Sequence, residues 1–293
     1  MTQTYSRLTI DERGVARLTL ERPDVHNAFD DSLIAELNAH LEHLHDAAHH
    51  GEVRVVVLGS EGKSFSAGAD LGWMKRMVEY DLDGNLADSR KLATLMHRLD
   101  TLPCPTLCRV QGAAFGGAVG LAACCDVVVA SEKAKFCLSE VKIGLSPAVI
   151  SPYVQRALGE RQARRYALTA EVMDAPTARS LDLVHQVVAP DELDGAVDAM
   201  LETLLSGSPQ AQRATKALLA EVAREPDSKA TREHTCRVIA ELRVSAEGQE
   251  GLASFFEKRR PAWTPEAPDT APDTAPDTAP DTAPDKTATE RRS

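Results

Sequence analysis

The stretch Val53-Arg54-Val55-Val56-Val57-Leu58 is mainly β-branched and apolar, and the small-residue segment Ser66-Ala67-Gly68-Ala69-Asp70 follows shortly after it. A short continuous apolar run of this kind is typical of a strand that is covered on both faces. Two further candidates of the same type are Thr106 to Val110 and Asp126 to Ala130. Segments with helical spacing, such as residues 92 to 99, separate these runs. The alternation predicts an α/β fold with right-handed crossovers.

The flanking segments fit the same plan. Residues 8 to 10 and 16 to 20 alternate apolar and polar side chains around Gly14, which predicts a hairpin. A helix should then begin at Asp30 or Asp31 and end at Gly51. Its apolar stripe consists of Leu33, Leu37, Leu41 and Leu44. From Arg161 onward the spacing is mostly helical, so we expect a helical C-terminal region.

Composition limits the possible functions. The 293 residues are 43% hydrophobic and 26% charged, as in an ordinary globular protein, and the net charge is -11. An acidic average argues against a general nucleic-acid or membrane-surface binder. No apolar run approaches the roughly 20 residues of a membrane span, and we expect a cytoplasmic protein. The six cysteines lack paired C-x-x-C spacing and should be buried reduced thiols.

The end of the chain has a different composition. From Ala267 the unit Ala-Pro-Asp-Thr is repeated four times, and polar and charged residues follow. Such a tract has too few apolar groups to offset the entropy of ordering, which predicts a disordered tail. The expected organisation is a core over residues 1–200, a helical region over 201–263 and the tail over 264–293.

Two loops of small residues follow strand candidates, residues 66 to 70 and residues 112 to 118. Glycines at a strand-to-helix junction allow backbone amides to point at a ligand oxygen, and the helix dipole adds positive potential there. Two facing junctions could donate to one oxygen and stabilise an enolate-like thioester. Tight turns and close helix packing are the alternative explanation.

Several motifs together give the sequence a family resemblance. Over about Tyr5 to Trp263 it resembles the crotonase (enoyl-CoA hydratase/isomerase) superfamily in the order and spacing of Glu21-Arg22-Pro23, Asn27-Ala28, residues 65 to 70, Gly112 to Gly117, Cys125-Asp126 and Ser139 to Leu145. The resemblance implies a spiral of ββα units with a helical C-terminal trimerisation region, and a homotrimer or homohexamer. It also implies an acyl-CoA substrate, with coenzyme A as part of the substrate and no metal or redox cofactor. Residues 70 to 74 and 144 to 150 look like the methylglutaconyl-CoA and carboxygeranoyl-CoA hydratase branch.

The same resemblance implies roles for individual residues. The oxyanion-hole amides fall on Ala69 and Gly117, and the acid/base glutamate falls on Glu140. Arg22 and Lys258 resemble positions that contact coenzyme A phosphates, and the resemblance allows Lys258 to do so within one subunit or across two. The complete set of expected substrate-binding residues is Ser66, Ala67, Gly68, Asp70, Leu71, Trp73, Met74, Gly116, Gly120, Arg22 and Lys258, and Met77 could join the apolar ones in lining the acyl pocket.

One position departs from the family pattern. Many family hydratases carry a second glutamate one helical turn beyond the oxyanion glycine, where this sequence has Gly120. We expect the missing side chain to leave space in the site. Either the enzyme is an isomerase that uses Glu140 alone, or it is a hydratase whose branched or carboxylated substrate needs that space, as in leucine or acyclic terpene catabolism. A non-catalytic acyl-CoA-binding paralogue is a third possibility.

Two other patterns suggest sites that we do not expect. Gly62-Lys63-Ser64 is similar to the end of a phosphate-binding P-loop, but Val57 stands where that motif needs its first glycine. His45 and His49 have the spacing of a metal-binding pair but lack an evident third ligand. We therefore predict neither nucleotide hydrolysis nor a metal site.

Overall fold

The computed structural model describes residues 4–264, and its centre is a six-stranded mixed sheet. The strand order is β1 (Ser6–Ile10), β2 (Val15–Leu20), β3 (Val55–Ser60), β4 (Thr106–Val110), β6 (Val127–Ser131) and β9 (Gln186–Val188). β1 and β2 form the predicted antiparallel hairpin, and every other pairing in this sheet is parallel. Every residue of β3 is buried, as its β-branched composition predicts. The α/β prediction is confirmed.

A second, three-stranded sheet consists of β5 (Ala113–Phe115), β7 (Lys135–Cys137) and β8 (Met173–Asp174). The chain visits the two sheets in turn. β4 leads to β5 and then to helix α4 (Gly117–Cys124), and β6 leads to β7 and then to the 3-10 helix η2 (Glu140–Ile143). This repeated strand–strand–helix turn is the predicted spiral.

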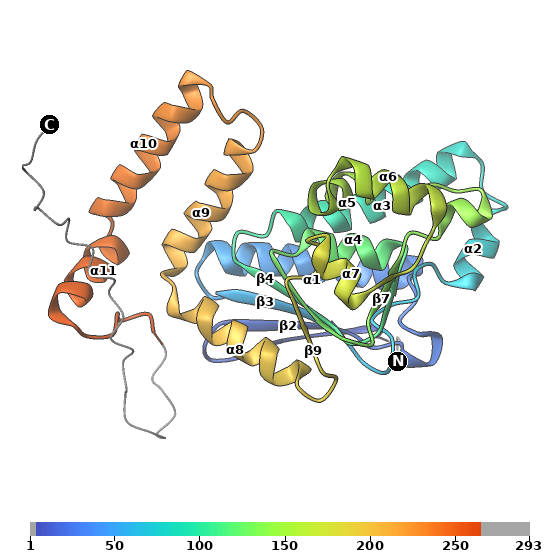
Figure 1. Cartoon of the computed structure of the whole chain (residues 1–293), viewed down its shortest axis with the longest axis horizontal. Helices are drawn as coiled ribbons and strands as arrows, with labels where there is room; N and C mark the ends of the chain where they lie inside the picture. Colours follow the sequence, from blue (N-terminus) through green and yellow to red (C-terminus); the bar gives the residue numbers. More distant parts are fainter. Residues whose placement is uncertain (1–3, 265–293) are drawn as a thin grey trace, which may run out of the picture.

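Helices cover both faces of the large sheet (Figure 1). One face carries α1 (Asp31–His49), α3 (Leu82–Asp100) and α4, and the main apolar core lies beneath them. The other face carries α8 (Leu193–Ser206), whose apolar residues form a separate cluster with β2, β3, β4 and β6. The shorter elements are η1 (Pro23–Val25), α2 (Leu71–Met77), α5 (Ser151–Leu158), α6 (Glu160–Thr169) and α7 (Ala175–Ser180).

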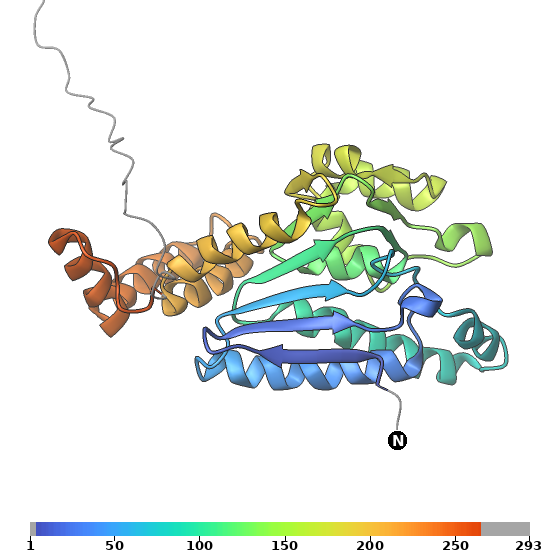
Figure 2. The ribbon, with the colours of Figure 1, turned by 90° about the horizontal axis from the view of Figure 1, so that it is seen from below.

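The C-terminal arm, residues 209–264, extends away from the core (Figures 1 and 2). It contains α9 (Pro209–Val222), α10 (Lys229–Val244) and α11 (Ala246–Glu257), and Ser254 is the one buried residue among these three helices. The predicted division after residue 200 falls inside α8, which packs on the core. The tail predicted over 264–293 lies, except for Thr264, outside the described residues. Within residues 4–264 no helix is long and apolar enough to span a membrane.

Candidate active site

The first small-residue loop places Ala69 between two fixed neighbours. The N–H of Phe29 donates to the carbonyl oxygen of Gly68 at 2.7 Å, and the N–H of Asp70 donates to that of Phe29 at 2.8 Å. Gly68 has φ +90°, and a Cβ there would lie 2.9 Å from the carbonyl oxygen of Phe115. Only glycine fits this conformation and this close approach. The loop is thus held rigidly with Ala69 exposed at its tip.

The second loop turns sharply into α4. Gly116 has φ +55°, and its N–H donates to the carbonyl oxygen of Cys137 at 2.9 Å. Gly117 is the first residue of α4, where unpaired amides and the helix dipole favour a negative ligand atom. Within residues 4–264, the N–H groups of Ala69 and Gly117 have no hydrogen-bond acceptor. Both amides are available to a ligand oxygen.

The two loops are bonded directly to each other. The N–H of Ser66 donates to the carbonyl oxygen of Ala113 at 2.9 Å, and the N–H of Phe115 donates to that of Ser66 at 3.0 Å. The hydroxyl of Ser66, which is fully buried, accepts from the N–H of Gly68 at 3.2 Å. The structure therefore brings the two predicted donor loops together in a fixed arrangement, which is what an oxyanion hole requires.

Glu140 lies beside these loops. It is the first residue of η2, and its Oε1 lies 3.2 Å from the place that a Cβ on Gly116 would take. Its Oε2 is buried and has no hydrogen-bond partner among the described residues. Burial disfavours the ionised form and raises the pKa of the carboxyl group. A half-buried carboxyl group with an unpaired oxygen and a raised pKa is suited to proton transfer.

Comparison with known proteins agrees with this geometry. The model of the family described as Enoyl-CoA hydratase/isomerase matches residues 11–266. The chain belongs to this family. A crystal structure of an enoyl-CoA hydratase from Shewanella pealeana is 49% identical, with a TM-score of 0.84 over 89% of this chain and 97% of that one. The crotonase fold predicted for the chain is therefore confirmed.

Two curated relatives show the range of reactions in this enoyl-CoA hydratase/isomerase family. An enoyl-CoA hydratase of Alternaria alternata is 33% identical over 84% of this chain and 80% of its own length. A trans-2-decenoyl-[acyl-carrier-protein] isomerase of Streptococcus mutans is 30% identical over 86% of this chain and 95% of its own length. Family membership thus indicates an enzyme that handles unsaturated acyl thioesters, and it leaves hydration and isomerisation both open.

The structure corrects the expectation about Gly120. A Cβ at this position would lie 2.2 Å from Cγ2 and 2.8 Å from Cβ of Ile150, and 3.2 Å from the sulfur of Met96. Ile150, which directly precedes α5, is itself 2% exposed. The place where other family members carry a second glutamate is therefore filled by apolar side chains. The prediction of vacated volume was wrong, because a segment distant in sequence packs against the glycine.

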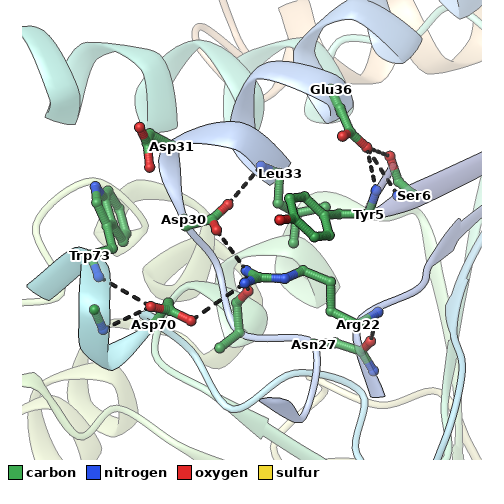
Figure 3. A network of polar contacts seen from close by, with 12 residues as sticks. Tyr5, Ser6, Arg22, Asn27, Asp30, Asp31, Leu33, Glu36, Asp70 and Trp73 are labelled. Carbon is green, nitrogen blue, oxygen red and sulfur yellow. Dashed lines mark hydrogen bonds and ion pairs between the residues drawn. The ribbon is translucent and has the colours of Figure 1, made fainter. Parts of the chain in front are cut away.

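Arg22, which we expect to contact coenzyme A phosphates, has several partners within the protein (Figure 3). Its guanidinium group donates to the carbonyl oxygen of Ala28 at 2.7 Å and forms ion pairs with Asp30 at 3.0 Å and Asp70 at 3.5 Å. It also lies 4.4 Å from the centroid of the Tyr5 ring. Its side chain is only 12% exposed and connects Asp30, the N-cap of α1, to Asp70, the N-cap of α2. The sequence around Arg22 gives no sign of these internal contacts.

Asp70 connects Arg22 to α2. Its other carboxylate oxygen accepts from the N–H groups of Gly72 and Trp73 at 2.8 and 3.1 Å, so Asp70 is the N-cap of α2. Figure 3 shows this cap together with the Arg22 contact. The carboxylate thus holds the N-terminus of the helix that follows the oxyanion loop.

The expected apolar pocket residues do not share one environment. Trp73 is 6% exposed, and its indole N–H donates to Asp88 at 2.8 Å, so it joins α2 to α3 within the core. Leu71 is 75% exposed, and Met74 is half-buried. Of these, Leu71 and Met74 remain available to a ligand, whereas Trp73 serves packing.

Lys258 and the two patterns that suggested a P-loop and a metal pair add no ligand-binding group to the oxyanion loops. Lys258 follows α11 at the end of the C-terminal arm, remote from α4 in the same chain (Figure 1). The carbonyl oxygen of Lys63 would lie 2.0 Å from a Cβ on Gly112, so this segment packs backbone to backbone. The rings of His45 and His49 lie 4.6 Å apart, and residues 4–264 contain no group of three or more side chains that could hold a metal ion.

Proposed function

We propose that this protein is a 2-enoyl-CoA hydratase that uses Glu140 as its one acid/base group. The observation that carries the proposal is the buried, partnerless Oε2 of Glu140 beside two free backbone amides, those of Ala69 and Gly117. The thioester oxygen would accept hydrogen bonds from both amides. The neighbouring carboxyl group would then handle the protons.

The proposed reaction needs one carboxylate. Ionised Glu140 accepts a proton from a water molecule as the water oxygen bonds to C3 of the enoyl group. The C2–C3 π electrons move toward the carbonyl, and the resulting enolate oxygen is stabilised by the amides of Ala69 and Gly117. The enolate then collapses, and Glu140 returns the proton to C2. This sequence calls for no metal or redox cofactor.

The packing at Gly120 supports this single-carboxylate scheme. Ile150 and Met96 occupy the surroundings of Gly120, so a second carboxylate has no room there. We propose a branched, carboxylated acyl group of the methylglutaconyl-CoA type as the substrate. Support for that acyl group comes from the resemblance of residues 70 to 74 and 144 to 150, since the argument from vacated volume no longer applies.

Isomerisation of the double bond is the second candidate. A single carboxylate is sufficient to move one proton between two carbons of the same enolate, and a relative that is 30% identical is described as a trans-2-decenoyl-[acyl-carrier-protein] isomerase. The oxyanion hole and Glu140 would serve this reaction unchanged. The two candidates differ in whether water is consumed.

We also propose that the protein assembles as a homotrimer or homohexamer and works in the cytoplasm. Large apolar side chains are exposed on the C-terminal arm, among them Leu219 at 61%, Val244 at 78%, Phe255 at 77% and Phe256 at 76%. An exposed apolar surface of this kind favours self-association. In such an assembly Lys258 could reach the coenzyme A of a neighbouring subunit.

A panel assay tests the proposed function. Purified protein is incubated with crotonyl-, methylcrotonyl-, methylglutaconyl- and carboxygeranoyl-CoA, and loss of the conjugated thioester absorbance is followed. We expect hydration of at least one 2-enoyl-CoA, fastest with a branched, carboxylated one. A 3-enoyl-CoA is assayed in parallel, and a gain of that absorbance with it, without hydration of any 2-enoyl-CoA, would show an isomerase. Binding of enoyl-CoA without turnover of any substrate would show a non-catalytic paralogue.

A further inference from the structure

Phe29 contacts both loops of the proposed oxyanion hole. Its backbone N–H donates to Gly68 and its carbonyl oxygen accepts from Asp70, so it bonds to both neighbours of Ala69. Phe29 and Ala69 form an isolated parallel bridge. This pairing fixes the Ala69 peptide and leaves the Ala69 N–H unpaired.

The side chain of Phe29 reaches the other loop. A Cβ on Gly117 would lie 3.2 Å from Cε2 and 3.3 Å from Cδ2 of the Phe29 ring. The ring edge therefore rests against the Cα of Gly117. The ring is 2% exposed and belongs to the main apolar core, so it has little freedom to move. One residue thus bonds to the loop of Ala69 and packs against the loop of Gly117.

We infer that Phe29 is a positioning residue that sets the separation of the Ala69 and Gly117 amides, with its ring as the spacer. This inference deepens the proposed function and rests on it. The two loops are also joined by two backbone hydrogen bonds of Ser66, but these lie beside β5, before the chain turns into α4. The Phe29 ring is the contact that reaches Gly117 itself.

The separation of the two donors matters because both must reach one oxygen. Oxyanion donors act at about 2.7 to 3.1 Å, and a misplacement of about 1 Å can lower a rate about a hundredfold. Substitution of the Phe29 side chain leaves the two backbone hydrogen bonds of residue 29 chemically possible. A variant therefore removes the spacer while it retains the pairing with the Ala69 loop.

Phe29→Leu tests the inference through the infrared carbonyl stretch of bound butyryl-CoA labelled with ¹³C at C1. This saturated thioester cannot be hydrated, so the measurement reports polarisation of the carbonyl whether or not the protein proves to be a hydratase. Wild-type protein should shift the stretch to lower frequency than in water. In Phe29→Leu we expect a clearly smaller shift. With a substrate that turns over, kcat should fall about tenfold or more while KM changes less than about threefold.

Leu44→Ala is the matched control. Leu44 is fully buried in the same helix-covered core, but it lies thirteen positions beyond Asp31, about 20 Å along α1. This truncation should cost at least as much stability as Phe29→Leu and leave the carbonyl shift at its wild-type value. If Phe29→Leu does not fold, Phe29→Met removes the flat ring but retains most of the volume. A wild-type carbonyl shift in the folded Phe29 variant, or equal losses in the variant and in Leu44→Ala, would overturn the inference.

Discussion

Two positions one turn apart at the N-terminus of α4, Gly116 and Gly120, have opposite surroundings. Beside Gly116 stands Glu140, a carboxyl group with one buried and unpaired oxygen. One turn further along, Gly120 is packed against Ile150 and Met96. A polar group without a partner is costly to bury, so its presence beside Gly116 points to function, whereas the apolar packing at Gly120 stabilises the fold. The difference teaches that proton transfer in this site takes place at the N-terminus of α4, and that the next turn of the helix serves packing.

The largest expected effect comes from removing the carboxylate of Glu140, the polar group beside Gly116. Glu140→Gln preserves size and hydrogen-bonding capacity but cannot accept a proton, so kcat should fall about a thousandfold. Binding of butyryl-CoA, measured by isothermal titration, should change little because the backbone amides remain. Turnover within about tenfold of wild type would mean that another group transfers the protons.

Introducing a carboxylate at Gly120, the apolar position, should destabilise the fold. In Gly120→Glu the new Cβ would overlap Ile150, and a carboxylate would be buried without a partner. We expect a loss of about 3 kcal/mol or more in the free energy of unfolding. The control is Gly195→Glu in α8, where a Cβ meets nothing within 4 Å. That substitution should change stability by less than about 1 kcal/mol in denaturant unfolding. Equal stability of the two variants would contradict the packing at Gly120.

A double-mutant cycle isolates the contact between Gly120 and Ile150. Gly120→Ala alone should cost about 1–3 kcal/mol, because its methyl group overlaps the isoleucine. In the Ile150→Ala background the same change should cost at least about 1 kcal/mol less, since the obstruction has been removed. Unfolding free energies of the four proteins give the coupling. Simple additivity would show that the two positions do not touch.

The smallest effect should be on stability as a function of pH. Burial raises the pKa of Glu140 in the folded protein, and the unfolded chain should ionise near its ordinary value of about 4.3. Below that value Glu140 is protonated in both the folded and the unfolded state, so its ionisation does not change the stability of the wild type. As pH rises toward and through the raised pKa, ionisation destabilises the folded wild type, but not Glu140→Gln. The variant should therefore match wild type in melting temperature at acid pH and exceed it near neutrality. If the difference in melting temperature between the variant and the wild type became smaller as pH rises, the raised pKa of Glu140 would be contradicted.

The fold was largely predictable because its signals are local. The hairpin, the helix capped by Asp30, and the runs that become β3, β4 and β6 appear where apolar periodicity and capping residues indicate. Three-residue strands such as β5, β7 and β9 carry too little periodicity to be recognised. They form because neighbouring strands supply their hydrogen-bond partners.

The candidate site was predictable in part. Gly68 and Gly116 have the positive φ values that small-residue loops lead one to expect, and Glu140 lies beside them. The roles of Phe29, Ile150 and Met96 had no signal in the sequence, because an apolar residue looks the same whether it fills a core or supports a site. The contacts of Arg22 with Asp30 and Asp70 could not be predicted, because the fold brings these partners to it.

Exchange of the C2 protons of butyryl-CoA in D₂O, followed by NMR, tests the central claim most directly. Exchange requires an enolate held by the amides of Ala69 and Gly117 and a carboxylate that removes the proton, and it does not depend on whether the natural reaction is hydration or isomerisation. We predict exchange at C2 with wild-type protein and a rate about a thousandfold lower with Glu140→Gln, at equal saturation. Exchange by Glu140→Gln at a rate close to wild type would contradict the account.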